Sequence, residues 1–565
     1  GPCEGATDGE VEDYTVNVLP PVTYVFNNGW TPSNPNGAST SLNDMIIANG
    51  NAVISSNISA NSVTVSPTAS LTVNPGNTFT VVNNVDMDSN SVNYSSLIVN
   101  GTLNANVTYT RHVNGNPGTG IGTGANDLIA PPVSGQSFSA FAAANNNLYE
   151  NPANPSQKRF GPFSKASGSY VNWDTNTNGS EILTAGVGYR AASNDNNGFV
   201  FSGTPNNGVV THNIVNSGPQ FAAYNLIGNP YPSYINVREF LEYDVEPGTP
   251  VVRNIDLMDS YGAIYGYDGD ASGTGSNGWT VYNLTTPTTV NITPGQGFLV
   301  TADAADVAAY DMTFTPAMRR IGNTDDFIPG RLADENNAHI KLLASMGTSN
   351  LTTDIFFNQA STSGLDFGYD AAVFGSNAAS KAIYSQLVEN NTGTDLAIQS
   401  LAYDAMGTDI SIPLGINVPQ GQQVTVSIAE SSLPANMEVY LEDSLEGTFT
   451  LLNSADYTFT PNTNLTDTGR FFLRFADATL SSPEAQLATV QIYATSNPRA
   501  LFVKGQLAEK STLQVYDIQG RVVMTGSLEG NSNSNQMDVS ALSSGPYIVV
   551  LKNSAQQKTQ KIILR

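Results

Sequence analysis

The sequence predicts an all-β, multi-domain protein: a small β-solenoid followed by β-sandwich domains and a C-terminal immunoglobulin-like β-sandwich. Asn, Ser, Thr and Gly supply most of the polarity of the 565-residue chain, in which only 12% of the residues are charged. Thr, Val, Tyr and Phe suit pleated strands, and Asn and Gly suit tight turns. Helical patterns are confined to two short candidates, 136–150 and 376–390. A chain of this length needs more than one hydrophobic core.

The first segment, 1–22, is predicted to be the terminal strand of a preceding domain, because apolar and polar residues alternate in GEVEDYTVNV. This stretch resembles the last strand of the GEVED-type domain found in surface proteins of Bacteroidetes. The resemblance implies that most of that domain lies before residue 1. In such a domain Glu10, Glu12 and Asp13 could hold a calcium ion, and a solvated acidic strand edge is the alternative.

The chain begins with Gly1 and no signal peptide precedes it, so we expect a processed or truncated piece of a longer protein. Its single cysteine, Cys3, either pairs with a cysteine upstream of residue 1 or stays unpaired. The sequence contains no run of about eighteen apolar residues, the length that a membrane-spanning helix needs.

Residues 23–113 are predicted to form the solenoid. Short apolar triplets recur, turn residues separate them, and several steps are close to eight residues. The triplets are MII at 45, AVI at 52, VTV at 63, LTV at 71, FTV at 79, LIV at 97 and VTY at 107. Because no helix is available for crossovers, the triplets favour coils of parallel strands stacked on one another. A meander of short antiparallel strands is the alternative.

Residues 114–322 contain an internal duplication and are predicted to form a β-sandwich with two pseudo-symmetric halves. Four segments recur in the same order in the two copies. They are NDLIAPPVSG at 126 and YNLIGNPYPS at 224, GSYVNW at 168 and GWTVYN at 278, LTAGVGYRA at 183 and ITPGQGFLV at 292, and FVFSGTP at 199 and MTFTPAM at 312. Each copy predicts an entering strand, a Pro-rich corner and two or three further strands.

Residues 323–480 carry nine strand-like segments with turns about every ten to fifteen residues. That rhythm is typical of an immunoglobulin-like or jelly-roll sandwich. Residues 481–494, which include SSPEAQLATV, are predicted to be a linker into the last domain, 495–565.

The last domain contains three spaced motifs. VYDIQGRV covers 515–522, a pattern with Leu542, Gly545, Tyr547 and Leu551 follows, and the third motif is KII at 561. Over the whole module they resemble the type A C-terminal sorting domain of the type IX secretion system. The Tyr-Pro-Asn-Pro run that commonly opens this family is replaced by TSNPRALFV, which leaves the start of the domain open. The sorting-signal residues that the resemblance implies are Tyr516, Asp517, Gly520, Arg521, Gly545, Tyr547 and Lys561.

This resemblance implies export across the outer membrane through the type IX translocon and its outer-membrane shuttle protein. Cleavage of the domain would follow, and the remainder would be anchored to surface lipopolysaccharide or released. From the residues alone, Gly520 lets a hairpin close, and Asp517 and Arg521 are near enough across the turn to pair.

The charge distribution sets the last domain apart. The chain has a net charge of −26 and no basic RNA-binding signature, which disfavours nucleic acid as a partner and is typical of soluble proteins. Residues 495–565 contain eight Lys/Arg and four Asp/Glu, a net of +4, whereas the remainder contains 14 and 44, a net of −30. Arg521, Lys552, Lys558 and Lys561 could form a basic face for the export machinery. Protection of an edge strand from aggregation is the alternative.

Catalytic signatures are missing from the sequence, so we expect a non-enzymatic protein without catalytic residues. His112, His212 and His339 are far apart and have no nearby acidic partner in the sequence, whereas zinc sites need clustered ligands. No G-x-S-x-G elbow, P-loop or dinucleotide fingerprint occurs. The carboxylate pairs Asp325-Asp326 and Glu442-Asp443 keep a glycosidase as an alternative, since a sequence does not show whether carboxylates face each other.

Calcium is the expected cofactor. The glycine-rich loop DGDASGTGSNG offers Asp268, Asp270 and Asn277 together with backbone carbonyls, and calcium prefers several oxygen ligands. DTNTNG at 174 starts like an EF-hand loop but has Ala185 where the bidentate acid belongs. A polar turn without metal is the alternative for both loops.

The tryptophans Trp30, Trp173 and Trp279 could stack on sugars if exposed. The last two occupy near-matching repeat positions, which favours core packing instead. Asp443-Ser444-Leu445 fits the short O-glycosylation pattern known in Bacteroidetes.

Together these features favour a secreted, non-catalytic cell-surface protein, an adhesin or gliding-related protein that binds a glycan or another surface ligand. Residues 24–480 also resemble repeat-bearing exports of Flavobacteria. The alternative is a carbohydrate-active enzyme or its glycan-binding accessory part, with the catalytic domain upstream of residue 1 or within 335–478.

Overall fold

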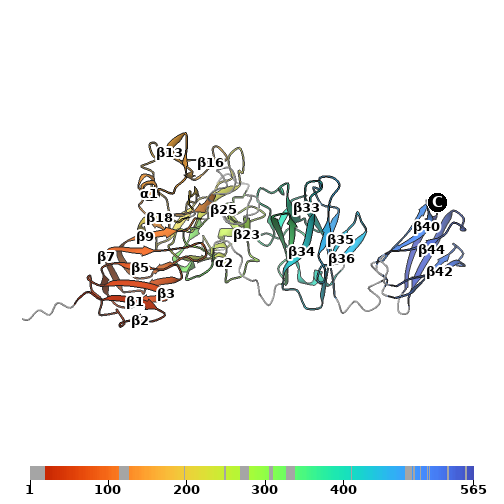
Figure 1. The fold of residues 1–565 in the computed structure, drawn as a ribbon, viewed down its shortest axis with the longest axis horizontal. Helices are drawn as coiled ribbons and strands as arrows, with labels where there is room; N and C mark the ends of the chain where they lie inside the picture. The colour runs from red at the N-terminus through yellow and green to blue at the C-terminus, as the bar shows by residue number, and fades with distance from the viewer. Residues whose placement is uncertain are drawn as a thin grey trace, which may run out of the picture.

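A computed structural model describes residues 20–113, 126–267, 279–303, 310–325, 338–477, 487 and 490–564, apart from residues 196, 247, 249, 409, 497, 506, 508, 531–533 and 554–556. Strands dominate and the helices are short, which confirms the predicted all-β fold. Figure 1 shows the regions in chain order: a solenoid, two repeat copies, a third β-region and a C-terminal domain. Among the residues described, no helix has the length and apolar character needed to cross a membrane.

The N-terminal region is a parallel β-solenoid of about four turns. Its strands are β1 (Thr23–Asn27), β2 (Trp30–Thr31), β3 (Asp44–Ile54), β4 (Ile58–Ala60), β5 (Val63–Val65), β6 (Ala69–Val73), β7 (Thr78–Met87), β8 (Ser96–Val99) and β9 (Thr102–Arg111). One stack of parallel strands runs β1-β3-β5-β7-β9 and another runs β3-β6-β8. All seven predicted triplets lie in these strands, so the solenoid is confirmed over the antiparallel meander.

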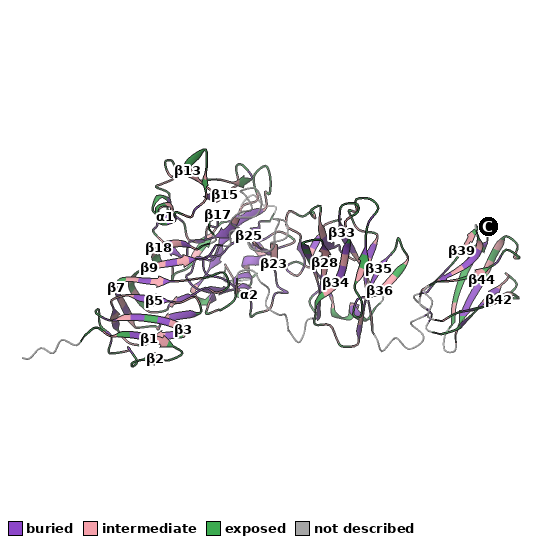
Figure 2. Ribbon diagram, in the orientation of Figure 1, coloured by how far each residue is buried: buried purple, intermediate pink, exposed green. Residues whose placement is uncertain are grey.

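In-register stacking places equivalent side chains of successive coils above one another. Val63 pairs with Val85 and Val85 pairs with Val107, and all three are 0% exposed. Outside the coils, the amide of Asn83 donates to Asn61 at 3.0 Å on the neighbouring coil. Figure 2 shows buried residues along these strands interrupted by exposed ones. An apolar interior and neutral polar ladders outside explain how the solenoid is stable with few charged residues.

The first repeat copy covers the last coil of the solenoid. β18 (Phe199–Pro205) pairs antiparallel with β9, and β11 (Val133–Ser134) pairs with β18. The helix α1 (Phe138–Ala144), which lies within the predicted segment 136–150, adds Phe138 and Phe141 to the solenoid core. This cover protects the edge of β9 from pairing with other chains. The predicted domain limit between residues 113 and 114 therefore crosses one continuous core.

The other elements of the repeat region are short. They are β10 (Asn126–Ile129), β12 (Glu150–Asn151), β13 (Asn154–Lys158), β14 (Phe160–Gly161), β15 (Phe163–Ser164), β16 (Ser169–Tyr170), β17 (Tyr189–Ala192), β19 (Val210–His212), β20 (Tyr224–Gly228), β21 (Tyr234–Asn236), α2 (Val237–Leu241), η1 (Asn254–Leu257), β22 (Ile264–Tyr267), β23 (Trp279–Tyr282), β24 (Asn291–Ile292), β25 (Gly297–Thr301), β26 (Met312–Phe314), η2 (Pro316–Met318) and β27 (Arg319–Arg320).

The duplication in the sequence reappears as an identical strand register. Leu128 of β10 faces Arg190 of β17, and at the matching positions Leu226 of β20 faces Leu299 of β25. The copies differ at their last matched strand, because β18 joins the open edge of the solenoid whereas its counterpart β26 pairs with β19. The copies thus have separate sheets, β10-β17-β14 and β20-β25-β22-β23.

The third region forms one connected sheet around its own core. Its elements are β28 (Ala338–Met346), β29 (Ser349–Asn358), β30 (Ala371–Ala372), β31 (Ala382–Ser385), β32 (Leu396–Ala402), η3 (Tyr403–Gly407), β33 (Ser411–Asn417), β34 (Val424–Ser431), β35 (Met437–Asp443), β36 (Thr448–Leu451), β37 (Tyr457–Phe459) and β38 (Phe471–Asp477). The helical candidate 376–390 is wrong, because β31 lies there and pairs with β33. A Cβ atom on Gly415 of β33 would lie 2.1 Å from the ring of Tyr384, so glycine makes this pairing possible.

The C-terminal domain consists of two antiparallel sheets around a separate core. Its strands are β39 (Gln491–Ser496), β40 (Arg499–Lys504), β41 (Ser511–Tyr516), β42 (Val522–Leu528), β43 (Ser534–Asp538), β44 (Gly545–Lys552) and β45 (Gln557–Leu564). β39 begins within the predicted linker 481–494, and Leu487 and Val490 belong to the core of this domain. The core of this domain therefore also includes residues ahead of the predicted start at residue 495.

Val85→Ala is expected to lower the free energy of unfolding by about 2 kcal/mol, because it removes two buried carbons from the stacked interior. Val82→Ala is the matched control: Val82 is on the same strand but 58% exposed, so a change below about 0.5 kcal/mol is expected. Urea unfolding followed by tryptophan fluorescence reports on this part of the chain, since all three tryptophans lie between residues 30 and 279. Equal losses in both variants would contradict the stacked core.

Candidate functional site

The predicted sorting residues gather at one end of the C-terminal sheet. Tyr516 ends β41 and faces Ile548 of β44, which faces Lys561 of β45. Because these strands are antiparallel, the end of β41, the starts of β42 and β44 and the end of β45 lie side by side. The residues brought together there are Tyr516, Asp517, Gly520, Arg521, Gly545, Tyr547 and Lys561.

Asp517 organises the hairpin turn between β41 and β42. Its carboxylate accepts hydrogen bonds from the backbone N–H groups of Gln519 and Arg521 at 2.9 and 3.0 Å, and from Arg521 Nε at 2.8 Å. Hydrogen bonding from the Arg521 backbone, more than any other cause, holds the pKa of this carboxyl below its usual value. Gly520 has a φ of +79°, the left-handed region that glycine favours. The predicted Asp517–Arg521 pair is present, and the sequence had not revealed the backbone bonds.

Of the remaining motif residues, some shape the domain and others are exposed to solvent. Gly545 has a φ of +154°, which residues with a side chain rarely adopt, and it opens β44. The Tyr547 hydroxyl donates to the Ser543 carbonyl at 2.9 Å, and its ring packs against the core. These two residues shape the domain, whereas the side chains of Arg521 and Lys561 are exposed to solvent.

The outer face at this end of the sheet is both apolar and basic. Val522, Ile548 and Ile563 are 48%, 42% and 63% exposed. Strand pairing places Val522, Tyr516, Ile548 and Lys561 in one row across the sheet. Exposed apolar side chains with a charged rim are typical of a surface that binds another protein. We call this row, with Ile563 beside it, the sorting face.

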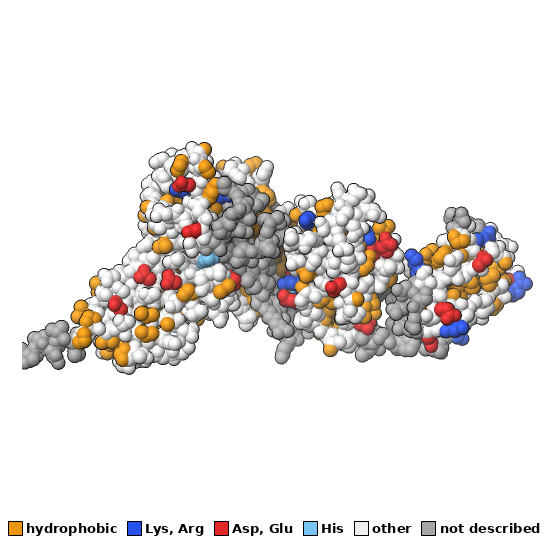
Figure 3. All heavy atoms as spheres, viewed as in Figure 1, with side chains coloured by type: hydrophobic (Ala, Val, Ile, Leu, Met, Phe, Trp, Pro, Cys, Tyr) orange, Lys and Arg blue, Asp and Glu red, His pale blue; other side chains and the backbone are white. Residues whose placement is uncertain are grey.

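The predicted four-residue basic face is not formed. Lys552 and Lys558 lie at the opposite end of β44 and β45, where Lys552 faces Gln557 and Lys558 faces Leu551. Antiparallel pairing over eight residues separates them from Arg521 and Lys561. Figure 3 shows Lys and Arg side chains distributed over the C-terminal domain rather than in one cluster.

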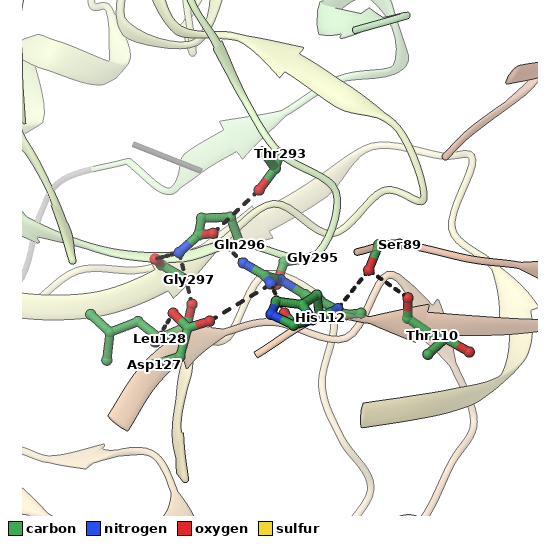
Figure 4. A network of polar contacts seen from close by, with 10 residues as sticks. Ser89, Thr110, His112, Asp127, Leu128, Thr293, Gly295, Gln296 and Gly297 are labelled. Atoms are coloured by element: carbon green, nitrogen blue, oxygen red, sulfur yellow. Dashed lines mark hydrogen bonds and ion pairs between the residues drawn. The ribbon is translucent and has the colours of Figure 1, made fainter. Parts of the chain in front are cut away.

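A buried polar cluster that the sequence had not indicated joins the solenoid to both repeat copies (Figure 4). Arg111, the last residue of β9, is fully buried. Its guanidinium donates to the Gly295 carbonyl at 2.9 Å and also to the His112 carbonyl and the Gln296 side chain. The carboxylate of Asp127 in β10, likewise 0% exposed, is 3.7 Å away.

The histidines do not form a shared site. His112 is buried beside Arg111, and burial lowers the pKa of His212 in β19. The expectation that no histidine has an acidic partner is wrong for His339, whose Nε2 lies 2.7 Å from Asp354 Oδ1. Pairing of β28 with β29 brings these two residues together, which their separation in the sequence conceals.

The candidate carboxylate pair Glu442-Asp443 does not have the arrangement of a glycosidase. Neighbouring strand residues point to opposite faces of a sheet. Glu442 pairs with Arg474 at 2.6 Å, and Asp443 pairs with Arg470 at 2.6 Å. Asp326 of the other candidate pair lies outside the described residues. Ser444 is exposed, and its hydroxyl donates to the Gly469 and Arg470 carbonyls at 3.0 and 2.9 Å.

The predicted calcium ligands Asp268, Asp270 and Asn277 lie outside the described residues, as do Glu10, Glu12 and Asp13. Asp174 is described, and its carboxylate accepts hydrogen bonds from Ser156 at 2.8 Å and Asn154 at 3.0 Å. Its oxygens therefore bind the loop itself. Within the described ranges, no three His, Cys, Asp or Glu residues cluster closely enough to hold a metal ion.

Comparison with known proteins gives two family matches. Residues 25–475 match a domain of unknown function, DUF8693, and residues 496–565 match the secretion system C-terminal sorting domain. None of the curated proteins matches the chain. Among solved structures, the BSP domain of a biofilm-associated protein is 15% identical, with a TM-score of 0.14, over 26% of this chain and 27% of that one. The FN1–FN3 domains of chicken CNTN1 are 12% identical, with a TM-score of 0.12, over 41% of this chain and 91% of that one. These scores support no inference about fold or function.

The fold and the tail define an exported, multi-domain β-protein that the type IX secretion system carries across the outer membrane to the cell surface or medium. The chain belongs to the DUF8693 family, whose model spans most of its length. Its C-terminal sorting domain engages the secretion machinery. The type A assignment and the GEVED-type resemblance stay predictions.

Arg111→Met is expected to lower the free energy of unfolding by about 3–5 kcal/mol, because it leaves Asp127 buried without its cation. Combining it with Asp127→Asn should restore part of the loss, since the second change removes the buried negative charge that Arg111 had balanced. Urea unfolding followed by tryptophan fluorescence measures all three variants. Additive losses in the double variant would show that the two side chains are not coupled.

Proposed function

We propose that this chain is a non-catalytic surface adhesin that the export machinery recognises through its sorting face. The observation that carries the proposal is the convergence of the predicted sorting residues at one end of the C-terminal sheet. The partner there is the type IX translocon together with its outer-membrane shuttle protein. A role in gliding would be one use of such surface attachment.

Two features support an adhesive rather than a soluble intracellular role. The regions that precede the C-terminal domain, which we call the body, form a long series of β-structures. They have many neutral polar side chains and few charges, a composition suited to multiple weak contacts outside the cell. The C-terminal domain has its own core, separate from the cores of the other regions. A sorting domain built in this way can be removed after export without exposing the core of the body.

A reporter fused to residues 487–565 is expected to reach the cell surface or medium of a host with a type IX secretion system, and the chain truncated after residue 486 is expected to stay in the periplasm. Fractionation and immunoblotting measure both. The fusion begins at 487 because Leu487 and Val490 belong to the core of the sorting domain. A reporter that stays in the periplasm of a host exporting its own substrates would contradict the assignment.

Substitutions in the sorting face are predicted to reduce export. Lys561→Glu combined with Ile548→Ser should reduce export about tenfold or more, because it reverses the charge and removes the apolar contact that a partner would cover. Lys552→Glu is the matched control, since it makes the same charge change on the same sheet but at the other end. Near-UV circular dichroism checks that both variants fold. Equal export of the two variants would show that recognition does not use the sorting face.

A further inference from the structure

A pocket of about 430 Å³ opens where the second repeat copy meets the third region. Residues 220–224, which lead into β20, form one wall, and Gly375 and Ser376, between β30 and β31, form the other. The backbone N–H of Gly375 donates to the Tyr224 hydroxyl at 2.8 Å and ties the two walls together. Junctions between regions are frequent places for ligand sites.

Both walls contain a residue in a strained backbone conformation. Phe221 has a φ of +50° and Ser376 has a φ of +62°. A left-handed φ is uncommon for residues other than glycine and is a genuine outlier for a bulky one, with a cost on the order of 1–3 kcal/mol. Such strain is concentrated at binding and catalytic sites, where the surrounding structure maintains it.

The first repeat copy maintains the strained loop. The ammonium group of Lys165 donates to the Ala222 carbonyl at 2.6 Å and the Tyr224 carbonyl at 2.7 Å, on either side of the pocket wall. The backbone N–H of Ser217 also donates to the Ala222 carbonyl, at 3.0 Å. The ring of Phe221 is thus presented by a loop with fixed hydrogen bonds.

Phe221 ends a stack of aromatic rings and is itself 46% exposed. Its ring is nearly parallel to that of Phe374, with the centroids 5.9 Å apart and an interplanar angle of 14°. Phe374 in turn stacks on Trp279 at 4.1 Å and 11°. The aromatic stack therefore extends from a partly buried tryptophan to a solvent-facing ring at the mouth of the pocket.

The chemistry of this pocket fits an uncharged sugar. An exposed aromatic ring stacks on the flat apolar face of a pyranose, and the exposed polar side chains of Gln220 and Ser376 lie where they can bind its hydroxyl groups. No lining residue is charged. Outside residues 495–565 the chain carries a net charge of −30, which disfavours polyanionic ligands. We propose that this pocket binds a neutral hexose unit of a glycan, stacked on Phe221.

This inference rests on the adhesive role proposed above and names the ligand class for it. The decisive variant is Phe221→Gly in the full chain. Glycine adopts a φ of +50° without strain, so the variant deletes the platform while keeping or raising the stability of the loop. Tyr403→Ala is the control, because Tyr403 is an aromatic residue with a similar exposure, 42%, in the third region but away from the pocket.

The probes are soluble neutral oligosaccharides of glucose, mannose and galactose, with a sulfated galactan as the anionic comparison. Binding is measured by titration calorimetry and by tryptophan fluorescence, since Trp279 stacks on the ring next to Phe221. We expect at least one neutral probe to bind, about tenfold or more weaker binding in Phe221→Gly, and no change in Tyr403→Ala.

Three results would overturn the proposal: no binding of any neutral probe, undiminished binding by a folded Phe221→Gly variant, or preference for the sulfated galactan. Attachment of whole cells to surfaces is scored separately in strains with each variant. If cells of the Phe221→Gly strain still attach, the proposal that this pocket is the binding site is rejected, whereas the proposal that the protein is an adhesin stands. Loss of surface display in the sorting-face variants tests export independently.

Discussion

The buried guanidinium of Arg111 is the interaction on which the assembly of the body depends. A charge removed from water is tolerated only where acceptors and a counter-charge converge on it. Here they come from the end of the solenoid, from Asp127 at the start of the first copy and from Gly295 and Gln296 ahead of β25 in the second copy. None of the three parts alone can satisfy this group, so they fold as one body.

A second arginine, at the C-terminal end of the repeat region, also connects that region to the solenoid. Arg319 of β27 donates to the carbonyl of Val99, the last residue of β8, at 3.1 Å and to the side chain of Asn100, which follows β8, at 2.8 Å. Burial lowers its pKa, and its guanidinium lies over the ring of Tyr231. The chain thus leaves the solenoid at one arginine and returns to it at another. This closed arrangement agrees with a single family model that extends from residue 25 to residue 475.

The sorting domain is organised on a different principle. In the body, the few buried charges fix the relative positions of whole regions. In the tail, the ionic pair of Asp517 and Arg521 is at the surface and shapes a single turn. An exposed pair contributes little stability, so its structural value lies in the geometry that the carboxylate imposes on the backbone. The domain has a core of its own, and its exposed outer face is the surface through which we propose that the export machinery recognises it.

Local pattern in the sequence determined the strands, their inward faces and the repeat register. Period-two alternation of apolar residues sets which side chains are buried whatever the partner strand is, so the triplets of the solenoid and the paired Leu128 and Leu226 positions were readable in advance. The turn at Gly520 and the pairing of Asp517 with Arg521 were also readable, because the two residues are only four positions apart, but the bonds from the backbone to the Asp517 carboxylate were not.

Only the tertiary structure decided which strands meet. Strand pairing depends on open edges and space far away in the chain: β18 completes the edge of β9, and the missing side chain of Gly415 admits Tyr384 where a helix was expected. Long-range pairing also joined His339 to Asp354, separated Lys552 and Lys558 from Arg521, and enclosed Arg111. Contacts between residues at long sequence distance leave no local periodicity, which is why these features could not be predicted from the sequence.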